Sequence, residues 1–272
     1  MRQPYSNGSV PYLQFHTLPP LTGLSHAIFT RQGGVSPIPF TSLNMSESVR
    51  DSANNVAANR ARAYSVLGRS VATVVQAHLV HGAAVMVVGR EHHGTIPGRF
   101  DGMITNEPGC GLAMNFADCA PILLVDPINK AIGLGHAGWQ GAIVDLPGAM
   151  VRAMQSTFGS DPATLWAGIG PSIGPCCYEV GEPVTSAVES AFDRPEELLI
   201  PQENGPRPHF DLPEANRRNL QQAGVRTIET APFCTACRTD LFFSHRAEKG
   251  RTGRFGVLMV LESDTDTDSL HK

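Results

Sequence analysis

Three short segments concentrate side chains that can bind a metal ion or transfer a proton, and each lies beside glycine. They are His78-Leu-Val-His81-Gly82, Ala117-Asp118-Cys119-Ala120-Pro121 and Gly135-His136-Ala137-Gly138. Each lies at the end of an apolar run typical of a strand, and functional sites often form where loops leave strand ends. His81, Cys119 and His136 together offer two imidazoles and a thiolate. This ligand set suits a catalytic zinc ion with an open fourth position.

Each of these residues also has a simpler explanation. An isolated histidine such as His136 can merely hydrogen-bond a turn, and an isolated cysteine is often buried and inert. The Asp118 carboxylate beside Cys119 favours a site, because it can orient a neighbouring histidine or handle a proton. His78 and His81 lie in a β-like stretch, where residues three apart point to opposite faces. We therefore expect at most one of the two in a given site, and the space beside Gly82 favours His81.

The remaining cysteines have several possible roles. Six cysteines in 272 residues are too sparse for a secreted disulfide scaffold, which indicates reduced thiols in a cytoplasmic protein. Cys234 and Cys237 form a single C-x-x-C, which is half of a structural zinc site or a redox pair. Cys176 and Cys177 are adjacent and would be strained if bridged to each other. We interpret these four as structural thiols.

Charge and hydropathy exclude several classes of protein. The formal net charge is −4, so the chain lacks the basic excess of a nucleic-acid-binding domain. No apolar stretch approaches the roughly 20 residues of a membrane span, and the first 20 residues contain no apolar core typical of a signal peptide. We therefore expect a cytoplasmic protein without nucleic-acid or membrane partners.

Apolar and amphipathic runs alternate along the chain and predict mixed strands and helices. We expect strands at 25–30, 71–76, 84–88, 112–116, 122–125, 131–135, 164–169, 225–229 and 255–261, and helices at 51–68, 141–158, 181–192 and 213–223, the second interrupted near Pro147-Gly148. The turns within 112–135 are too short for helical crossovers. This favours an α+β fold, a single large domain over 1–262 with mixed β-sheets flanked by helices, over a doubly wound α/β fold. Residues 263–272 are predicted to form a disordered tail.

Longer stretches of the sequence resemble the YfiH-type laccase-domain family, described as multifunctional purine nucleoside phosphorylases and once called polyphenol oxidases. The similar blocks run in order through most of the chain: FTRQGGVS (29–36), SLN (42–44), VHGAAV (80–85), FDGMIT (100–105), ADCAPILLVDP (117–127), GHAGWQG (135–141), AGIGPSIGPCCYEVG (167–181), FDLPEAN (210–216), CT (234–235), FFSHR (242–246) and GRTGR (250–254). The ADC-P, HAGW-G and GPSIGPCCYEVG blocks are highly specific when they occur together.

The resemblance implies a YfiH-like fold and a cytoplasmic, zinc-dependent enzyme. Its implied reactions are phosphorolysis of adenosine, inosine, guanosine and methylthioadenosine, and deamination of adenosine, so purine nucleosides and phosphate are the expected partners. It implies metal ligands at His81, Cys119 and His136, catalytic roles for Cys119, His136 and Asp118, and substrate binding by Arg31, Asn44 and Arg246. One departure bears on phosphate binding: the family's HAGW is often followed by Arg-Gly, and here Gln140 takes the arginine's place.

Three other functions are compatible with parts of the pattern. A copper oxidase acting on phenols is the older description of the family, but a multicopper centre requires His-x-His pairs and this chain has none. Copper can still occupy the zinc ligands in vitro. A cysteine-type amidase acting on cell-wall precursors would use Cys119 as nucleophile and His136 as base. A metal-dependent binding protein is disfavoured, because a binding surface does not need three reactive side chains beside glycine turns.

Overall fold

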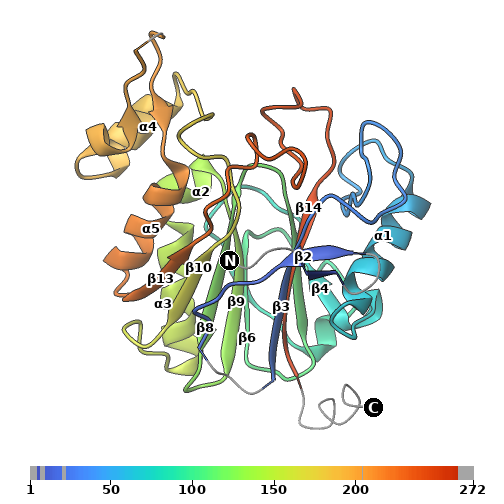
Figure 1. The fold of residues 1–272 in the computed structure, drawn as a ribbon. Helices are drawn as coiled ribbons and strands as arrows, with labels where there is room; N and C mark the ends of the chain where they lie inside the picture. Colours follow the sequence, from blue (N-terminus) through green and yellow to red (C-terminus); the bar gives the residue numbers. More distant parts are fainter. Residues whose placement is uncertain (1–4, 7–9, 20–22, 204, 263–272) are drawn as a thin grey trace.

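Two stacked β-sheets, covered on their outer faces by helices, form the framework of the computed structural model (Figure 1). The structure describes residues 5–6, 10–19, 23–203 and 205–262, so the tail expected at 263–272 lies outside it. The first sheet has the strand order β1-β2-β3-β14-β7-β4, and the second has the order β13-β10-β8-β9-β6-β5. β11 and β12 form a separate two-stranded sheet.

The elements follow one another along the chain with short connections. The strands are β1 (Tyr5–Ser6), β2 (Pro11–Leu13), β3 (Leu24–Phe29), β4 (Val74–Gln76), β5 (Val85–Val87), β6 (Gly102–Thr105), β7 (Gly111–Phe116), β8 (Ala120–Asp126), β9 (Ala131–Ala137), β10 (Trp166–Ile169), β11 (Leu199–Ile200), β12 (His209–Phe210), β13 (Thr227–Thr230) and β14 (Phe255–Leu261). The α-helices are α1 (Ala53–Ser65), α2 (Trp139–Ile143), α3 (Leu146–Phe158), α4 (Val184–Ala191) and α5 (Leu212–Gln222). Short 3₁₀ helices cover Val71–Thr73, Arg90–His92 and Pro195–Glu197.

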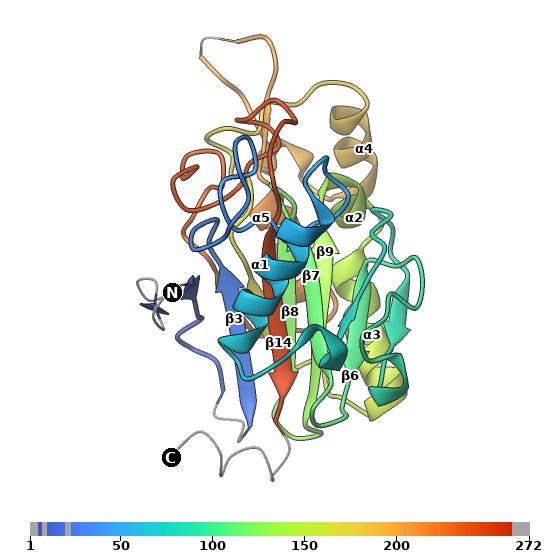
Figure 2. The same cartoon turned by 90° about the vertical axis from the view of Figure 1, so that its right-hand side faces the viewer.

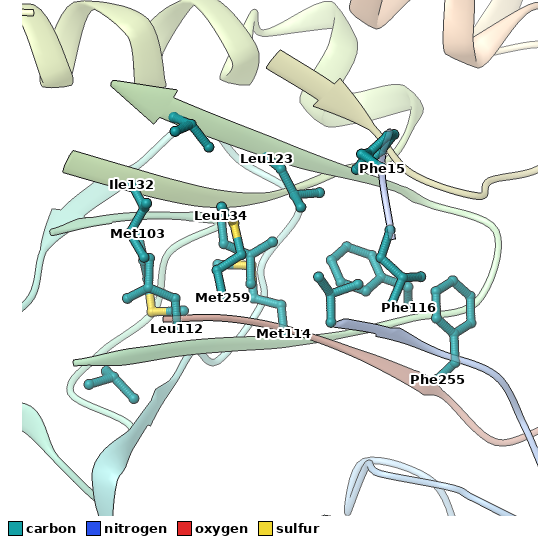
Figure 3. Packing of buried hydrophobic residues seen from close by; sticks show 14 of the residues in the cluster. Phe15, Met103, Leu112, Met114, Phe116, Leu123, Ile132, Leu134, Phe255 and Met259 are labelled. Atoms are coloured by element: carbon teal, nitrogen blue, oxygen red, sulfur yellow. The ribbon is translucent and has the colours of Figure 1, made fainter. Parts of the chain in front are cut away.

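The main core lies between the two sheets. Leu112, Met114 and Met259 of the first sheet face Leu123 and Leu134 of the second, and all are buried (Figure 3). The helix α1 packs on the outer face of the first sheet (Figure 2), and α3 and α5 pack on the outer face of the second. Every residue of β8, β9 and β14 is therefore buried, which explains why these strands are apolar along both faces except at Asp126 and His136.

The predicted α+β class with mixed sheets is confirmed. β8 pairs antiparallel with both β9 and β10, whereas β10 and β13 are parallel. The strands and helices expected from the sequence agree with the observed ones to within three residues at each end, the 141–158 segment excepted. The strand β6 was not predicted, and neither were the short strands β1, β2, β11 and β12. No helix among the described residues has the length and apolar character needed to cross a membrane.

The helix expected over 141–158 is in fact two helices, and the break precedes the predicted point. α2 ends at Ile143, and Asp145 adopts a left-handed conformation with φ 54°. Its carboxylate accepts the backbone N–H of Gly148 at 3.0 Å and so caps α3. Pro147 lies in the first turn of α3, where backbone N–H groups have no acceptor within the helix, so the absence of an N–H on proline costs no helical hydrogen bond. The proline thus begins the second helix instead of kinking a longer one.

Candidate metal centre and active-site cavity

His81, Cys119 and His136 meet where the chain passes from the first sheet to the second. Each offers a nitrogen or sulfur atom, and these ligand atoms lie within 4.8 Å of one another. His81 belongs to the loop between β4 and β5, and Cys119 to the turn that joins β7 to β8. His136 is the penultimate residue of β9, directly across from Pro121 of β8. Strand pairing therefore brings Cys119 and His136 together, and the β4–β5 loop adds His81.

The buried carboxylate of Asp101, just before β6, fixes both histidines. It accepts the backbone N–H groups of His81 at 3.0 Å and Gly82 at 2.8 Å. Its Oδ1 lies 3.3 Å from Nδ1 of His136, and its main-chain oxygen accepts the His136 N–H at 2.8 Å. Because Nδ1 of His136 faces Asp101, Nε2 is the nitrogen left to bind a metal ion. Carboxylates in this position set the tautomer and orientation of ligand histidines.

Asp101 remains ionised despite its burial. Burial would raise the pKa of its carboxyl, but the hydrogen bonds from His136, Gly82 and His81 lower the pKa below its usual range. The sequence pattern does not single out Asp101 as a site residue. The only signal was a carboxylate between Phe100 and Gly102 in an otherwise apolar block, which by itself is compatible with a turn.

Unusual backbone conformations surround the cluster. His81 and Asp118 have positive φ angles of 61° and 86°, which non-glycine residues rarely adopt. Such residues persist only where the surrounding structure holds them, and they concentrate at functional sites. Position 138 has room only for glycine, because a Cβ there would lie 2.7 Å from Sγ of Cys119. Local backbone strain at His81 and Asp118 therefore accompanies the close approach of the three ligand atoms.

Asp118 holds the Cys119 turn in place. Its carboxylate accepts the hydroxyl groups of Thr235 at 2.6 Å and Ser244 at 2.7 Å, and the backbone N–H of Arg246 at 2.7 Å. Among the described residues no hydrogen bond links it to His81 or His136. The carboxylate that orients a histidine is therefore Asp101, and Asp118 connects the Cys119 turn to the loops that carry its three donors.

The surroundings of Cys119 and His136 favour an ion pair between a thiolate and an imidazolium. Burial alone would raise the pKa of the Cys119 thiol, but the charge of His136 and hydrogen bonds from both histidines lower it to about 6. Burial would likewise lower the pKa of His136, but the Cys119 thiolate and Asp101 raise it to about 9. The thiolate, the form that binds metals and attacks electrophiles, is thus stabilised at neutral pH.

The cluster lies in a cavity of about 810 Å³. This volume is within the range of small-molecule sites. Residues 77–84 form a loop and not the β-like segment that we expected, so His78 and His81 line the same cavity. Only His81 belongs to the three-ligand cluster. Other side chains that line the cavity are Arg60, Trp139, Gln140, Tyr178, His245, Arg246 and Arg254.

Of the three arginines that line the cavity, Arg60 is paired with Glu47 at 2.8 Å, which leaves the charges of Arg246 and Arg254. Arg246 lies over the ring of Tyr178, 5.0 Å from its centroid, and donates to the main-chain oxygen of Glu179. Arg254 donates to the main-chain oxygens of Thr252 and Gly253. Within the described part of the chain neither arginine forms an ion pair with a carboxylate, so both charges are available to an anion.

Arg31 and Asn44 lie outside the cavity lining. The Arg31 guanidinium donates to the main-chain oxygens of Thr41 and Thr239 and pairs with Glu248 at 3.0 Å. Asn44 is fully buried, and its Oδ1 accepts the backbone N–H of Arg254 at 3.0 Å. Both residues therefore contact the segments that form the cavity wall. Gln140 lines the cavity itself.

Comparison with known proteins gives a consistent result. A family model described as "Multi-copper polyphenol oxidoreductase laccase" matches residues 25–262. The purine nucleoside phosphorylase YlmD of Geobacillus stearothermophilus is 39% identical over 247 residues, covering 87% of this chain and 89% of YlmD. The crystal structure of that YlmD superposes with a TM-score of 0.87 and 34% identity, covering 96% of this chain and 99% of the other.

A second solved structure, the hypothetical protein YfiH of Bacillus licheniformis, matches with a TM-score of 0.86 and 31% identity, over 93% of this chain and 97% of that one. The fold and the clustered His81, Cys119 and His136 define a laccase-like domain with a candidate metal centre. The chain belongs to this family, whose relatives include the YlmD and YfiH proteins, as the sequence motifs indicated. Several of these relatives are named purine nucleoside phosphorylases.

Replacing Asp101 by Asn should weaken zinc binding about 10- to 100-fold, because the substitution removes the negative charge that orients His136 and the His81 loop. Competition with a chromophoric chelator measures this affinity. Asp126→Asn is the matched control, since Asp126 is also buried and accepts backbone N–H groups, at the opposite end of β8. Equal affinity in wild type and Asp101→Asn would contradict the role given to Asp101.

The Cys119 thiol should ionise near pH 6 in metal-free protein. The difference in ultraviolet thiolate absorbance between wild type and Cys119→Ala should rise with pH through this midpoint. His136→Ala should move the midpoint upward, because the neighbouring positive charge is lost. Cys110→Ala is the control: burial raises the pKa of the Cys110 thiol to about 11, so its removal leaves the signal near pH 6 unchanged. A wild-type midpoint close to that of a free cysteine would refute the ion pair.

Proposed function

We propose that this protein is a zinc-dependent purine nucleoside phosphorylase that cleaves adenosine, inosine, guanosine and methylthioadenosine, and that it also deaminates adenosine. One observation carries the proposal: the three clustered metal-ligand side chains and two arginines without carboxylate partners line the same cavity. The names of the relatives support phosphorolysis. A reducing, cytoplasmic location fits the six free cysteines.

The residues of the cluster fit a catalytic zinc ion. Two imidazoles and one thiolate leave a fourth position open, and Asp101 supplies the hydrogen bond that ligand histidines usually make. His81, Cys119 and His136 would hold the ion. When bound, zinc supplies Lewis acidity within the cavity. The same nitrogen and sulfur ligands also bind copper, so copper loading in vitro is expected.

Phosphorolysis requires a phosphate ion close to C1′ of the ribose. Arg246 and Arg254 present guanidinium groups, which bind phosphate oxygens in pairs. Burial lowers the pKa of Arg254, while Cys119, Asp118 and Glu248 oppose that effect, so the guanidinium keeps its charge. Asn44 holds the Arg254 backbone, and the Asp118 carboxylate holds that of Arg246. These buried partners position both arginines before phosphate arrives.

The rest of the cavity lining suits a purine nucleoside. Trp139 and Tyr178 provide aromatic surface for the base, and Gln140 provides an amide that can donate and accept hydrogen bonds. As the glycosidic bond breaks, the departing purine gains negative charge and requires a proton. The imidazoles of His78 and His245 also line the cavity and are candidates for the proton donor.

A second candidate function rests on the Cys119–His136 ion pair. A thiolate with a pKa of about 6 beside an imidazolium is the arrangement of a cysteine hydrolase, with Cys119 as nucleophile and His136 as base. An amidase acting on cell-wall precursors would use it through an acyl-cysteine intermediate. Such an enzyme would work without metal, so activity that survives chelation, together with a trapped Cys119 adduct, would favour this function.

Incubation with adenosine and phosphate, followed by chromatography of the products, tests the proposal. Adenine reports phosphorolysis and inosine reports deamination. The variant His136→Ala should lose the zinc ion held by His81, Cys119 and His136, together with both activities, while it keeps the wild-type fold by circular dichroism. A zinc content equal to that of wild type in this variant would refute the proposed function. So would a zinc-loaded wild-type protein that forms neither adenine nor inosine.

The variant Arg254→Gln should raise the KM for phosphate about 10- to 100-fold, which corresponds to the loss of one hydrogen bond to a charged group. The KM for the nucleoside should change much less. Arg251→Gln provides the matched control, because Arg251 is exposed and lies outside the cavity lining. Equal KM values for phosphate in the two variants would show that Arg254 does not bind the anion.

A further inference from the structure

Four cysteines form a second cluster, separate from the His81 group. Cys176 and Cys177 lie in the loop after β10, and Cys234 and Cys237 lie in the loop after β13. Their four sulfur atoms all lie within 4.8 Å of one another. Sγ of Cys237 is 3.4 Å from Sγ of Cys176 and 3.3 Å from Sγ of Cys177. Residues about 60 positions apart in the chain thus place four thiols around one point.

The sulfur separations match metal coordination better than disulfide bonding. Four sulfurs bound tetrahedrally to zinc at about 2.3 Å would lie roughly 3.8 Å apart. A disulfide requires about 2.05 Å, and all four cysteines are free. Soft thiolate ligands without nitrogen or oxygen partners select zinc or copper(I), and a closed set of four is typical of structural zinc sites.

The backbone around the four sulfurs is already organised. The N–H of Gly174 donates to Sγ of Cys234 at 3.3 Å. The N–H of Cys177 donates to the Gly174 carbonyl at 3.0 Å, and the N–H of Arg238 closes the C-x-x-C turn onto the Cys234 carbonyl at 3.0 Å. Cys234 and Cys177 are partly buried, whereas Cys176 and Cys237 are exposed. An ion can therefore enter from solvent into a preformed set of ligands.

The two loops that carry these cysteines also build a wall of the active-site cavity. Ile173 and Tyr178, in the first loop, line the cavity. The Thr235 hydroxyl, in the second loop, donates to Asp118. The loops touch at a bridge between Ser172 and Cys234, where the Thr235 N–H donates to the Ser172 carbonyl at 3.0 Å. A link between the loops would therefore hold in place both Tyr178 and Thr235, which donates to Asp118.

We propose that Cys176, Cys177, Cys234 and Cys237 bind a second, structural zinc ion that joins these two loops. Binding converts four thiols to thiolates and releases four protons to solvent, with no change of oxidation state. This ion has no open coordination position, so it takes no part in the reaction. The protein thus carries two chemically different metal sites per chain, one with nitrogen and sulfur ligands and one with sulfur alone.

Zinc content per chain, measured by elemental analysis after dialysis in reducing buffer, tests this proposal. Wild type should hold two zinc ions, His136→Ala should keep only the four-cysteine ion, and Cys234→Ser/Cys237→Ser should keep only the His81-site ion. The double variant should also melt at a lower temperature. Cys110→Ser is the matched control, because it alters a buried thiol outside both clusters and should keep both ions.

Two results would overturn the proposal. One is a single zinc ion in wild type that disappears entirely in His136→Ala. The other is a disulfide among these four cysteines, found by mass spectrometry after alkylation without reduction. If the double variant does not fold, replacing the bound zinc by cobalt in variants that carry Cys176→Ser provides the test. Cys176 is exposed, so its substitution should leave the fold intact. In His136→Ala the thiolate-to-cobalt absorption should persist, and adding Cys176→Ser should reduce it; absorption unchanged by Cys176→Ser would count against the site.

Discussion

The candidate active site depends on one buried carboxylate, that of Asp101. It accepts backbone N–H groups from the His81 loop and faces Nδ1 of His136, so a single charge fixes two ligands that come from different parts of the chain. A buried carboxylate with so many donors stays ionised and is costly to leave unpaired. The loop and the end of β9 are therefore held together whether or not a metal ion is bound, and the imidazoles are oriented before binding.

The two-sheet framework explains why the site forms at this position. β7 belongs to the first sheet and β8 to the second, so the three residues between them must turn sharply from one layer to the other. That turn contains Asp118 in a strained conformation and Cys119 beside it. The hydroxyls of Thr235 and Ser244 secure the turn through Asp118. Loops from distant parts of the chain thus enclose the thiolate and bring Arg246 and Arg254 into the same cavity.

Much of this arrangement could be predicted from the sequence, and the part that could not has a physical reason. Periodicity located most strands and helices, and ligand chemistry selected His81, Cys119 and His136, because residue type and neighbouring glycines are local signals. Asp101 and Tyr178 were not selected, since their roles arise from contacts across the fold. Arg31 and Asn44 matched family motifs, yet they hold the cavity wall from outside. The four cysteines were predicted to be structural thiols, and only the fold shows that the adjacent pair meets the C-x-x-C turn.

The central claim is that His81, Cys119 and His136 together form a metal centre of two imidazoles and one thiolate. X-ray absorption spectroscopy at the zinc edge, applied to the variant Cys234→Ser/Cys237→Ser, reports the ligands of this centre alone. We expect two nitrogen ligands at about 2.0–2.1 Å and a single sulfur ligand at about 2.3 Å, with a further light-atom ligand in the open position. A first shell without sulfur, a shell of sulfur alone, or a variant that holds no zinc would contradict it.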